Sequence, residues 1–127
     1  MAKYQNPVHK VLDPGLNFTG VVVGADVAGG TFATFGPGGV PGAPSVRTAD
    51  ADDQIIGVFK YDAALGETVG ILSGGQCSVI AGAAITAGQG VVANATGRAV
   101  PAGAGVKGYG TAYTDGATGD AVYIHFS

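Results

Sequence analysis

The chain has 127 residues and a net charge of −3, which suits one domain with a modest core and offers no basic cluster for nucleic acid. Its 24 glycines far exceed the usual share of roughly 7%, and only 12% of its residues are charged. The glycines do not recur at every third position, as collagen requires, and valine, isoleucine and threonine are too frequent for a typical disordered chain. The composition therefore indicates a glycine-rich folded protein.

Nothing in the hydropathy pattern predicts contact with a membrane. No uncharged apolar run reaches the roughly 18 to 20 residues that a membrane-spanning helix needs. Residues 1–7 lack the hydrophobic stretch of a signal peptide, so we expect synthesis in a cytoplasm. A single cysteine, Cys77, leaves no internal disulfide framework, and its apolar surroundings favour a small buried side chain.

Residues 1–19 are predicted to form an N-terminal arm, distinct from a body over 20–127. Asn6 is a possible helix cap, Pro7 suits the first helical position, and Pro14-Gly15 ends the segment. One or two helical turns fall well below the roughly 12 to 15 residues that an isolated helix needs, so the arm must dock on something to be ordered.

The body consists of short β-favouring runs separated by glycine. This pattern predicts an all-β fold, either a small β-barrel or a sandwich, preceded by the extended N-terminal arm. The segment 36–44 contains three prolines and four glycines and is predicted to be a surface loop. The predicted strands are 20–24, 31–35, 55–61, 68–72, 76–80, 91–93, 98–100, 109–114 and 121–126.

An internal repeat relates residues 57–71 to 110–124 in register and without a gap, within two segments of about 55–73 and 108–127. Each copy predicts a strand, a turn of the form Asp-x-Ala-x-Gly-acid, and a second strand. In each turn the aspartate can accept bonds from nearby backbone N–H groups and the glycine can take a positive φ. The predicted turn residues are Asp62 and Gly66 in the first copy, and Asp115 and Gly119 in the second.

No residue pattern predicts catalysis, a cofactor or a metal ion, so we expect a protein that is not an enzyme. The segment 103–108 fits G-x-G-x-x-G, but it lacks the strand-to-helix setting of a dinucleotide site. The acidic run 50–53 lacks the later glycine and glutamate of a calcium-binding EF-hand loop, and is predicted to be a solvated turn. His9 and His125 are the only histidines, and His125 is expected on the polar face of the last strand.

The stretches 56–69, 83–92 and 105–110, together with the closing hairpin, resemble the tailed-phage head decoration or capsid cement proteins of the DUF2190 type. The resemblance covers roughly residues 55–127. It implies a compact β-barrel-like body, often trimeric, that sits on the exterior of an icosahedral head and clamps neighbouring subunits of the major capsid protein. The predicted location is therefore the outside of a virion.

The arm replaces the short opening strands that the resemblance implies, so we hypothesise that the arm lies across capsid protein. Interface energy concentrates in aromatic and large apolar groups. The alternative is a carbohydrate- or cell-surface-binding module displayed on a virion; such a module needs an exposed aromatic platform, whereas tryptophan is absent and the tyrosines are scattered along the sequence. The candidate capsid contacts are Tyr4, Val8, His9, Val11, Leu12 and Phe18.

Overall fold

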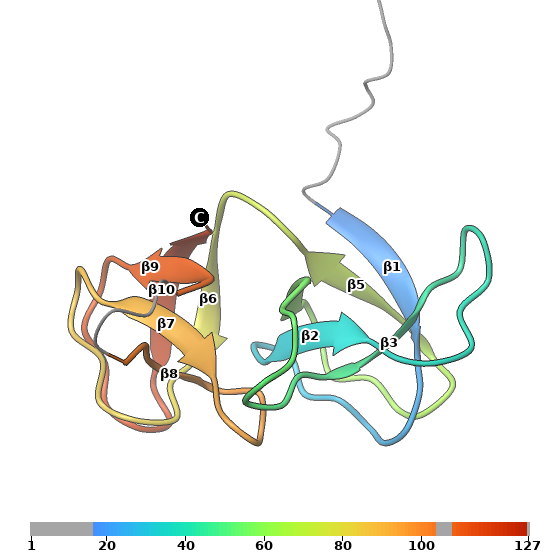
Figure 1. The fold of residues 1–127 in the computed structure, drawn as a ribbon, viewed down its shortest axis with the longest axis horizontal. Coiled ribbons are helices and arrows are strands. Elements are labelled where there is room, and N and C mark those ends of the chain that lie inside the picture. Colours follow the sequence, from blue (N-terminus) through green and yellow to red (C-terminus); the bar gives the residue numbers. More distant parts are fainter. Residues whose placement is uncertain (1–16, 104–107, 127) are drawn as a thin grey trace, which may run out of the picture.

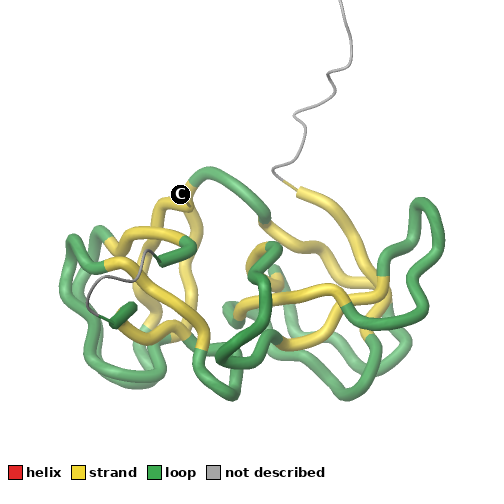
Figure 2. Tube along the Cα trace, viewed as in Figure 1, coloured by secondary structure: helices red, strands yellow, loops and turns green. Residues whose placement is uncertain are grey.

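The computed structural model describes residues 17–103 and 108–126, and all regular structure in them is β-strand (Figure 2). The predicted all-β class, with a barrel in it, is confirmed. In these residues no helix is long and apolar enough to cross a membrane. The strands form two groups of five, side by side and joined by the loop between β5 and β6 (Figure 1).

The first half is a closed barrel with the strand order β1-β3-β2-β4-β5. Neighbouring strands pair antiparallel except for β1 and β3, which are parallel, and β5 returns to β1 to close the barrel. A closed barrel leaves no exposed sheet edge to pair with another chain. Its strands are β1 (Asn17–Val22), β2 (Phe32–Phe35), β3 (Ser45–Thr48), β4 (Gly57–Phe59) and β5 (Thr68–Leu72).

The second half repeats this ladder. Its strand order is β6-β10-β9-β7-β8, which corresponds to β1-β5-β4-β2-β3 when the closed first barrel is followed in the opposite direction. Val21 pairs with Thr68 in the first half, and Ile80 with Ala121 at the equivalent place in the second. The parallel contact of β1 with β3 is represented by a single parallel bridge between Ala81 and Ala99. The chain is therefore one five-strand unit built twice. The strands of the second unit are β6 (Gln76–Ile80), β7 (Gly90–Ala93), β8 (Ala99–Pro101), β9 (Gly110–Ala112) and β10 (Ala121–Phe126).

The sequence repeat corresponds to the last two strands of each unit, and two of its matched glycines have the same physical reason. A Cβ atom on Gly57 would collide with the carbonyl oxygen of Leu72 on β5. A Cβ atom on Gly110 would lie 2.9 Å from the carbonyl oxygen of His125, the equivalent residue on β10. Both positions bring the backbones of two strands too close for a side chain.

The two halves share part of their core. Phe32 and Val58 are fully buried in one cluster with Val79 and Ile124, although the first pair belongs to the first half and the second pair to the second. Two backbone bonds also cross between the halves: Phe32 N donates to Gly97 O at 2.7 Å, and Ile80 N donates to Gly30 O at 2.8 Å. A second cluster, which includes Val46 and Ile71, fills the first barrel.

Most predicted strands are present, with two differences. The pattern missed β3, which directly follows the proline-glycine loop and contains Arg47; the strand forms because β1 and β2 pair with it from both sides. The predicted arm boundary is also displaced, because β1 begins at Asn17 and takes in residues 17–19. Residues 1–16 lie outside the described residues.

Candidate functional site

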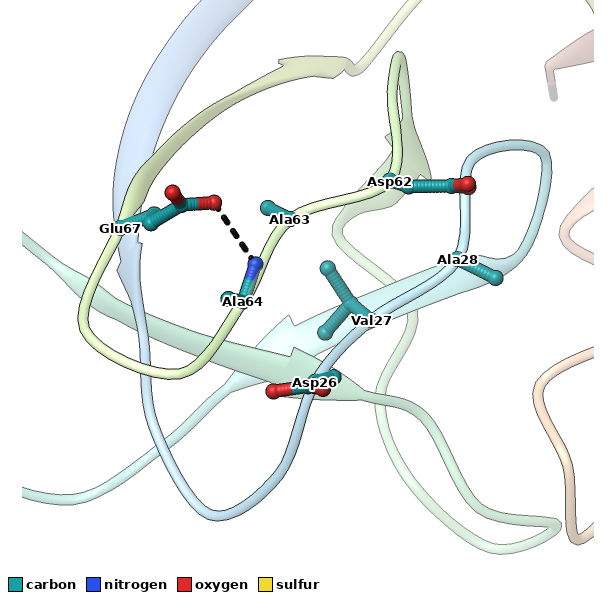
Figure 3. A pocket seen from close by; sticks show the side chains of 7 residues that line it. All are labelled: Asp26, Val27, Ala28, Asp62, Ala63, Ala64 and Glu67. Atoms are coloured by element: carbon teal, nitrogen blue, oxygen red, sulfur yellow. Dashed lines mark hydrogen bonds between the residues drawn. The ribbon is translucent and has the colours of Figure 1, made fainter.

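The most elaborate polar arrangement is a pair of turns on the first barrel, at residues 26–31 and 62–67 (Figure 3). Val27 and Ala63 exchange backbone hydrogen bonds of 2.9 and 3.0 Å. The residue before each of them then bonds to the other turn: Asp26 Oδ1 accepts from Leu65 N at 2.9 Å, and Asp62 Oδ1 accepts from Gly29 N at 2.8 Å. The two turns are therefore tied together reciprocally.

The second half contains the same pair with one of the two carboxylate bonds missing. Ile85 and Gly116 exchange backbone bonds of 2.8 and 3.0 Å, and Asp115 Oδ1 accepts from Ala87 N at 2.8 Å. The residue before Ile85, at the position equivalent to Asp26, is Ala84. Its side chain has no oxygen that could accept a hydrogen bond from the N–H of Thr118.

The predicted roles of the turn residues need one correction. Asp62 and Asp115 were expected to accept bonds within their own turns, but each accepts from a turn 33 or 28 residues away along the chain. Residues five positions further on make the bonds within the turns: Glu67 accepts from Ala64 N at 2.8 Å, and Asp120 accepts from Ala117 N at 2.9 Å. The turn glycines lie at positive φ, 88° for Gly66 and 91° for Gly119.

A pocket of about 560 Å³ lies over the first turn pair. Its acids are Asp26, Asp62 and Glu67, and Figure 3 shows them at three separate points around Val27 and Ala63. Each carboxylate already accepts a backbone N–H bond. No group of three or more metal-ligating side chains occurs in the described part of the chain. The acids here hold the turns together.

The other predicted sites have structural explanations where they are described. Asp53 accepts two bonds from the Arg47 guanidinium, at 2.8 and 3.3 Å, and one from Asp50 N at 2.8 Å. These bonds, that from Arg47 above all, lower the pKa of the Asp53 carboxyl. Burial raises the pKa of the Cys77 thiol to about 11, so the thiolate is disfavoured. His125 is exposed on β10. His9 lies outside the described residues, as do four of the six positions of the glycine motif at 103–108.

Of the candidate capsid contacts, only Phe18 is described. It lies on β1, packs partly against the core of the first barrel, and its ring centroid is 6.2 Å from that of Phe35. The other five are in the undescribed part of the arm, so their role stays a prediction. They are Tyr4, Val8, His9, Val11 and Leu12.

An aromatic pair on the second half was not predicted from the sequence. Tyr113 and Tyr123 are both about half exposed, and their ring centroids are 6.2 Å apart with planes tilted by 42°. Tyr113 N donates to Tyr123 O at 2.9 Å, just as Lys60 N donates to Gly70 O in the first half. The internal repeat carried the signal, because it aligns Tyr113 with Lys60 and Tyr123 with Gly70. The tyrosines are ten residues apart and meet only through strand pairing.

No protein-family model matches the sequence, and no curated protein does. Membership of the decoration-protein family therefore stays a prediction. Among solved structures, the chain is similar to the head fiber gp8.5 N base of bacteriophage phi29, with a TM-score of 0.74 and 21% sequence identity. The match covers 87% of this chain and 92% of that chain. At this identity the likeness shows that the two share a fold.

Proposed function

We propose that this protein is a structural component of a bacteriophage virion, that it binds the outside of the capsid, and that it stabilises the capsid by bridging subunits of the major capsid protein. The observation that carries the proposal is the fold shared with a phage head fiber base over nearly the whole length of both chains. We propose that the protein acts by binding and is not an enzyme. As the sequence resemblance implies, we propose that it assembles as a homotrimer.

The physical character of the body supports this role. The turn carboxylates bond to backbone N–H groups, and those bonds join segments far apart in the sequence. Charge-assisted bonds of this kind rigidify a surface without supplying a reactive group. A rigid body that binds only assembled capsid stabilises it by mass action, and several copies linked in a trimer strengthen the attachment through effective concentration.

We place the attachment to capsid mainly in the arm. The anchors proposed are its aromatic and large apolar side chains, because such groups dominate the energy of protein interfaces. The structure defines a truncation point for the arm. Strand β1 begins at Asn17, so deletion of residues 1–16 leaves all five strands of the first barrel.

The test uses heads of the encoding phage assembled without this protein. Purified full-length protein is mixed with the heads, the heads are pelleted, and the bound protein and the temperature of genome release are measured. We expect saturable binding at a fixed ratio to capsid subunits, and heads that survive a higher temperature. Sedimentation analysis of the free protein checks the trimer. If full-length protein fails to bind the heads, the proposed function is wrong.

Two variants locate the attachment. Deletion of residues 1–16 should abolish binding while leaving the unfolding midpoint of the body unchanged. A triple variant, Tyr4→Ala, Val8→Ala and Leu12→Ala, should weaken binding strongly, whereas Lys3→Ala with Gln5→Ala is the matched control and should bind like the wild type. Undiminished binding by the deletion variant would assign attachment to the body instead.

The alternative of a carbohydrate- or cell-surface-binding module gains support from one feature, the exposed Tyr113–Tyr123 pair. A virion protein can carry such a site on a surface separate from its capsid contact.

A further inference from the structure

We infer that the outward face of β6, β10 and β9 is a binding site for neutral carbohydrate. The strand registers define this face, which we call the tyrosine face. Tyr123 on β10 pairs with Ser78 on β6, and the exposed Tyr113 follows the end of β9. In the adjoining row His125 pairs with Gln76 on one side and with Thr111 on the other. The tyrosine face is Gln76, Ser78, Thr111, Tyr113, Tyr123 and His125.

The side chains of the tyrosine face suit a sugar ring. The two phenol rings are 48% and 47% exposed, so their surfaces are open to the C–H groups of a pyranose. Tyr113 Oη donates to Gln76 Oε1 at 3.2 Å, and the amide group of Gln76 supplies two further donors for sugar hydroxyls. Thr111, Ser78 and His125 add hydroxyl and imidazole partners for sugar hydroxyls. A few placed polar groups beside aromatic surface are typical of small-ligand sites.

The charge of the tyrosine face favours an uncharged ligand. None of its six members is Lys, Arg, Asp or Glu, so nothing there neutralises a sulfate or a uronate. The whole chain carries a net charge of −3, which further disfavours an acidic polymer. Neutral hexoses and N-acetylhexosamines are the chemical class that remains.

The equivalent row of the first half shows why we favour sugar over protein at this face. There Phe32 pairs with Val58, and Val58 pairs with Leu72. This apolar row packs against the core cluster that fills the second half. In the second half the same row is Gly90, Thr111 and His125, which has no large apolar side chain. The packing of one half against the other uses the apolar version of this row, and the tyrosine face has Thr111 and His125 at the equivalent positions.

The tyrosines themselves are not required by the fold. Their equivalents in the first half, Lys60 and Gly70, keep the same backbone hydrogen bond without any aromatic ring. Tyr113 and Tyr123 are about half exposed and form an apolar patch beside the polar side chains of Gln76, Ser78, Thr111 and His125, and exposed apolar patches can mark interaction sites. The first half also supplies a control, because Tyr61 is 66% exposed and is not one of the six residues of the tyrosine face.

The experiment measures binding of the isolated full-length protein to a fixed set of probes. These are native gels containing soluble starch, hydroxyethyl cellulose or glycol chitin, with polygalacturonate as the anionic probe, followed by titration calorimetry with the matching hexasaccharide. We expect retardation by at least one neutral probe and none by polygalacturonate. Tyr113→Ala and Tyr123→Ala should each weaken the calorimetric affinity about tenfold, which corresponds to about 1.4 kcal/mol. Tyr61→Ala should stay within about twofold.

Unfolding midpoints of the three variants keep the result interpretable, since exposed positions should leave stability nearly unchanged. The inference is overturned if no neutral probe binds, if binding survives both tyrosine variants, or if polygalacturonate binds as well as the neutral polymers. Head pelleting with the same variants separates this site from the capsid function. If Tyr113→Ala and Tyr123→Ala no longer bind heads, and the protein binds none of the sugar probes, the tyrosine face is a protein contact and the proposed carbohydrate site is wrong.

Discussion

Strand β4 of the first half and β9 of the second have equivalent places in their ladders, yet their central side chains meet different surroundings. Val58 on β4 is fully buried in the core that the two halves share, whereas Thr111 on β9 is exposed. The ladder is thus the same while the outer surface of the sheet differs. In arrays of repeated units, a terminal unit carries a polar outer face because no further unit covers it. The second half has the character of such a terminal unit.

This comparison shows how a duplicated fold can gain a second function. One copy of the outer surface holds the two halves together and is constrained by packing. The other copy is free of that constraint and can acquire polar groups and exposed aromatic rings without loss of the fold.

The largest effect is expected for Phe32→Ala, which removes a fully buried ring from the contact between the halves. Truncation of a buried phenylalanine costs about 3–5 kcal/mol. Urea unfolding followed by two-dimensional NMR should show the amide signals of Val46 in the first half and Val122 in the second disappearing together at a lower midpoint.

Phe35→Ala is the control, on the same strand but 52% exposed, and should cost less than about 1 kcal/mol. Separate unfolding transitions of the two halves in the wild type would contradict the shared core. An equal loss of unfolding free energy in Phe32→Ala and Phe35→Ala would contradict it as well.

How well the fold could be predicted from the sequence depends on how far apart along the chain the interacting residues lie. The bounds of β5, β6 and β10 were predicted as observed, because alternation of buried and exposed residues is a local signal. The repeat was visible over two strands out of five. Elsewhere the two units keep the register but not the residues: Phe18 of β1 is matched by Cys77 of β6.

The candidate sites were harder to predict for the same reason. The bond between Asp62 and Gly29 spans 33 residues, and the Tyr113–Tyr123 pair exists only because β9 and β10 are neighbours. Neither has a local pattern. Comparison of the two units position by position would have indicated the tyrosine pair, since it places Tyr123 where the first unit has Gly70 and Tyr113 where it has Lys60.

The next effect concerns the matched glycines Gly57 and Gly110. Alanine at Gly57 would strike the Leu72 carbonyl and the Ile71 side chain, and overpacking of this kind costs about 1–3 kcal/mol. Alanine at Gly110 meets the His125 carbonyl at 2.9 Å and should lie at the lower end of that range. Denaturant unfolding of the two variants checks the order. A neutral Gly57→Ala would show that the strands can separate and that the match between the units is not steric.

A smaller effect comes from the turn pairs. Asp62→Ala removes the acceptor for Gly29 N and should cost about 1 kcal/mol. Ala84→Asp supplies the one bond that the second pair lacks, to the N–H of Thr118, and should stabilise by about 0.5 kcal/mol. Thermal unfolding measures both changes.

Ala83→Asp is the matched control for Ala84→Asp, because it adds the same charge one residue away without reaching the facing turn. If Ala83→Asp and Ala84→Asp shift the midpoint equally, the gain is electrostatic and the proposed equivalence of the turn pairs fails.

The smallest effect is a pH dependence that comes from the Arg47–Asp53 pair of the first half. Arg47 on β3 holds Asp53, while Val100 occupies the equivalent position on β8. The bond from Arg47 lowers the pKa of Asp53 in the folded protein, so as the pH falls below about 4 the unfolded chain takes up a proton more readily. The stabilisation is therefore present above the unfolded pKa and is lost as the pH falls through the folded one. Asp53→Asn should reduce the slope of the melting temperature against pH between about 5 and 2, whereas Asp52→Asn, which leaves the Arg47 pair intact, should preserve it. An unchanged slope in Asp53→Asn would mean that the ion pair makes no difference to acid stability.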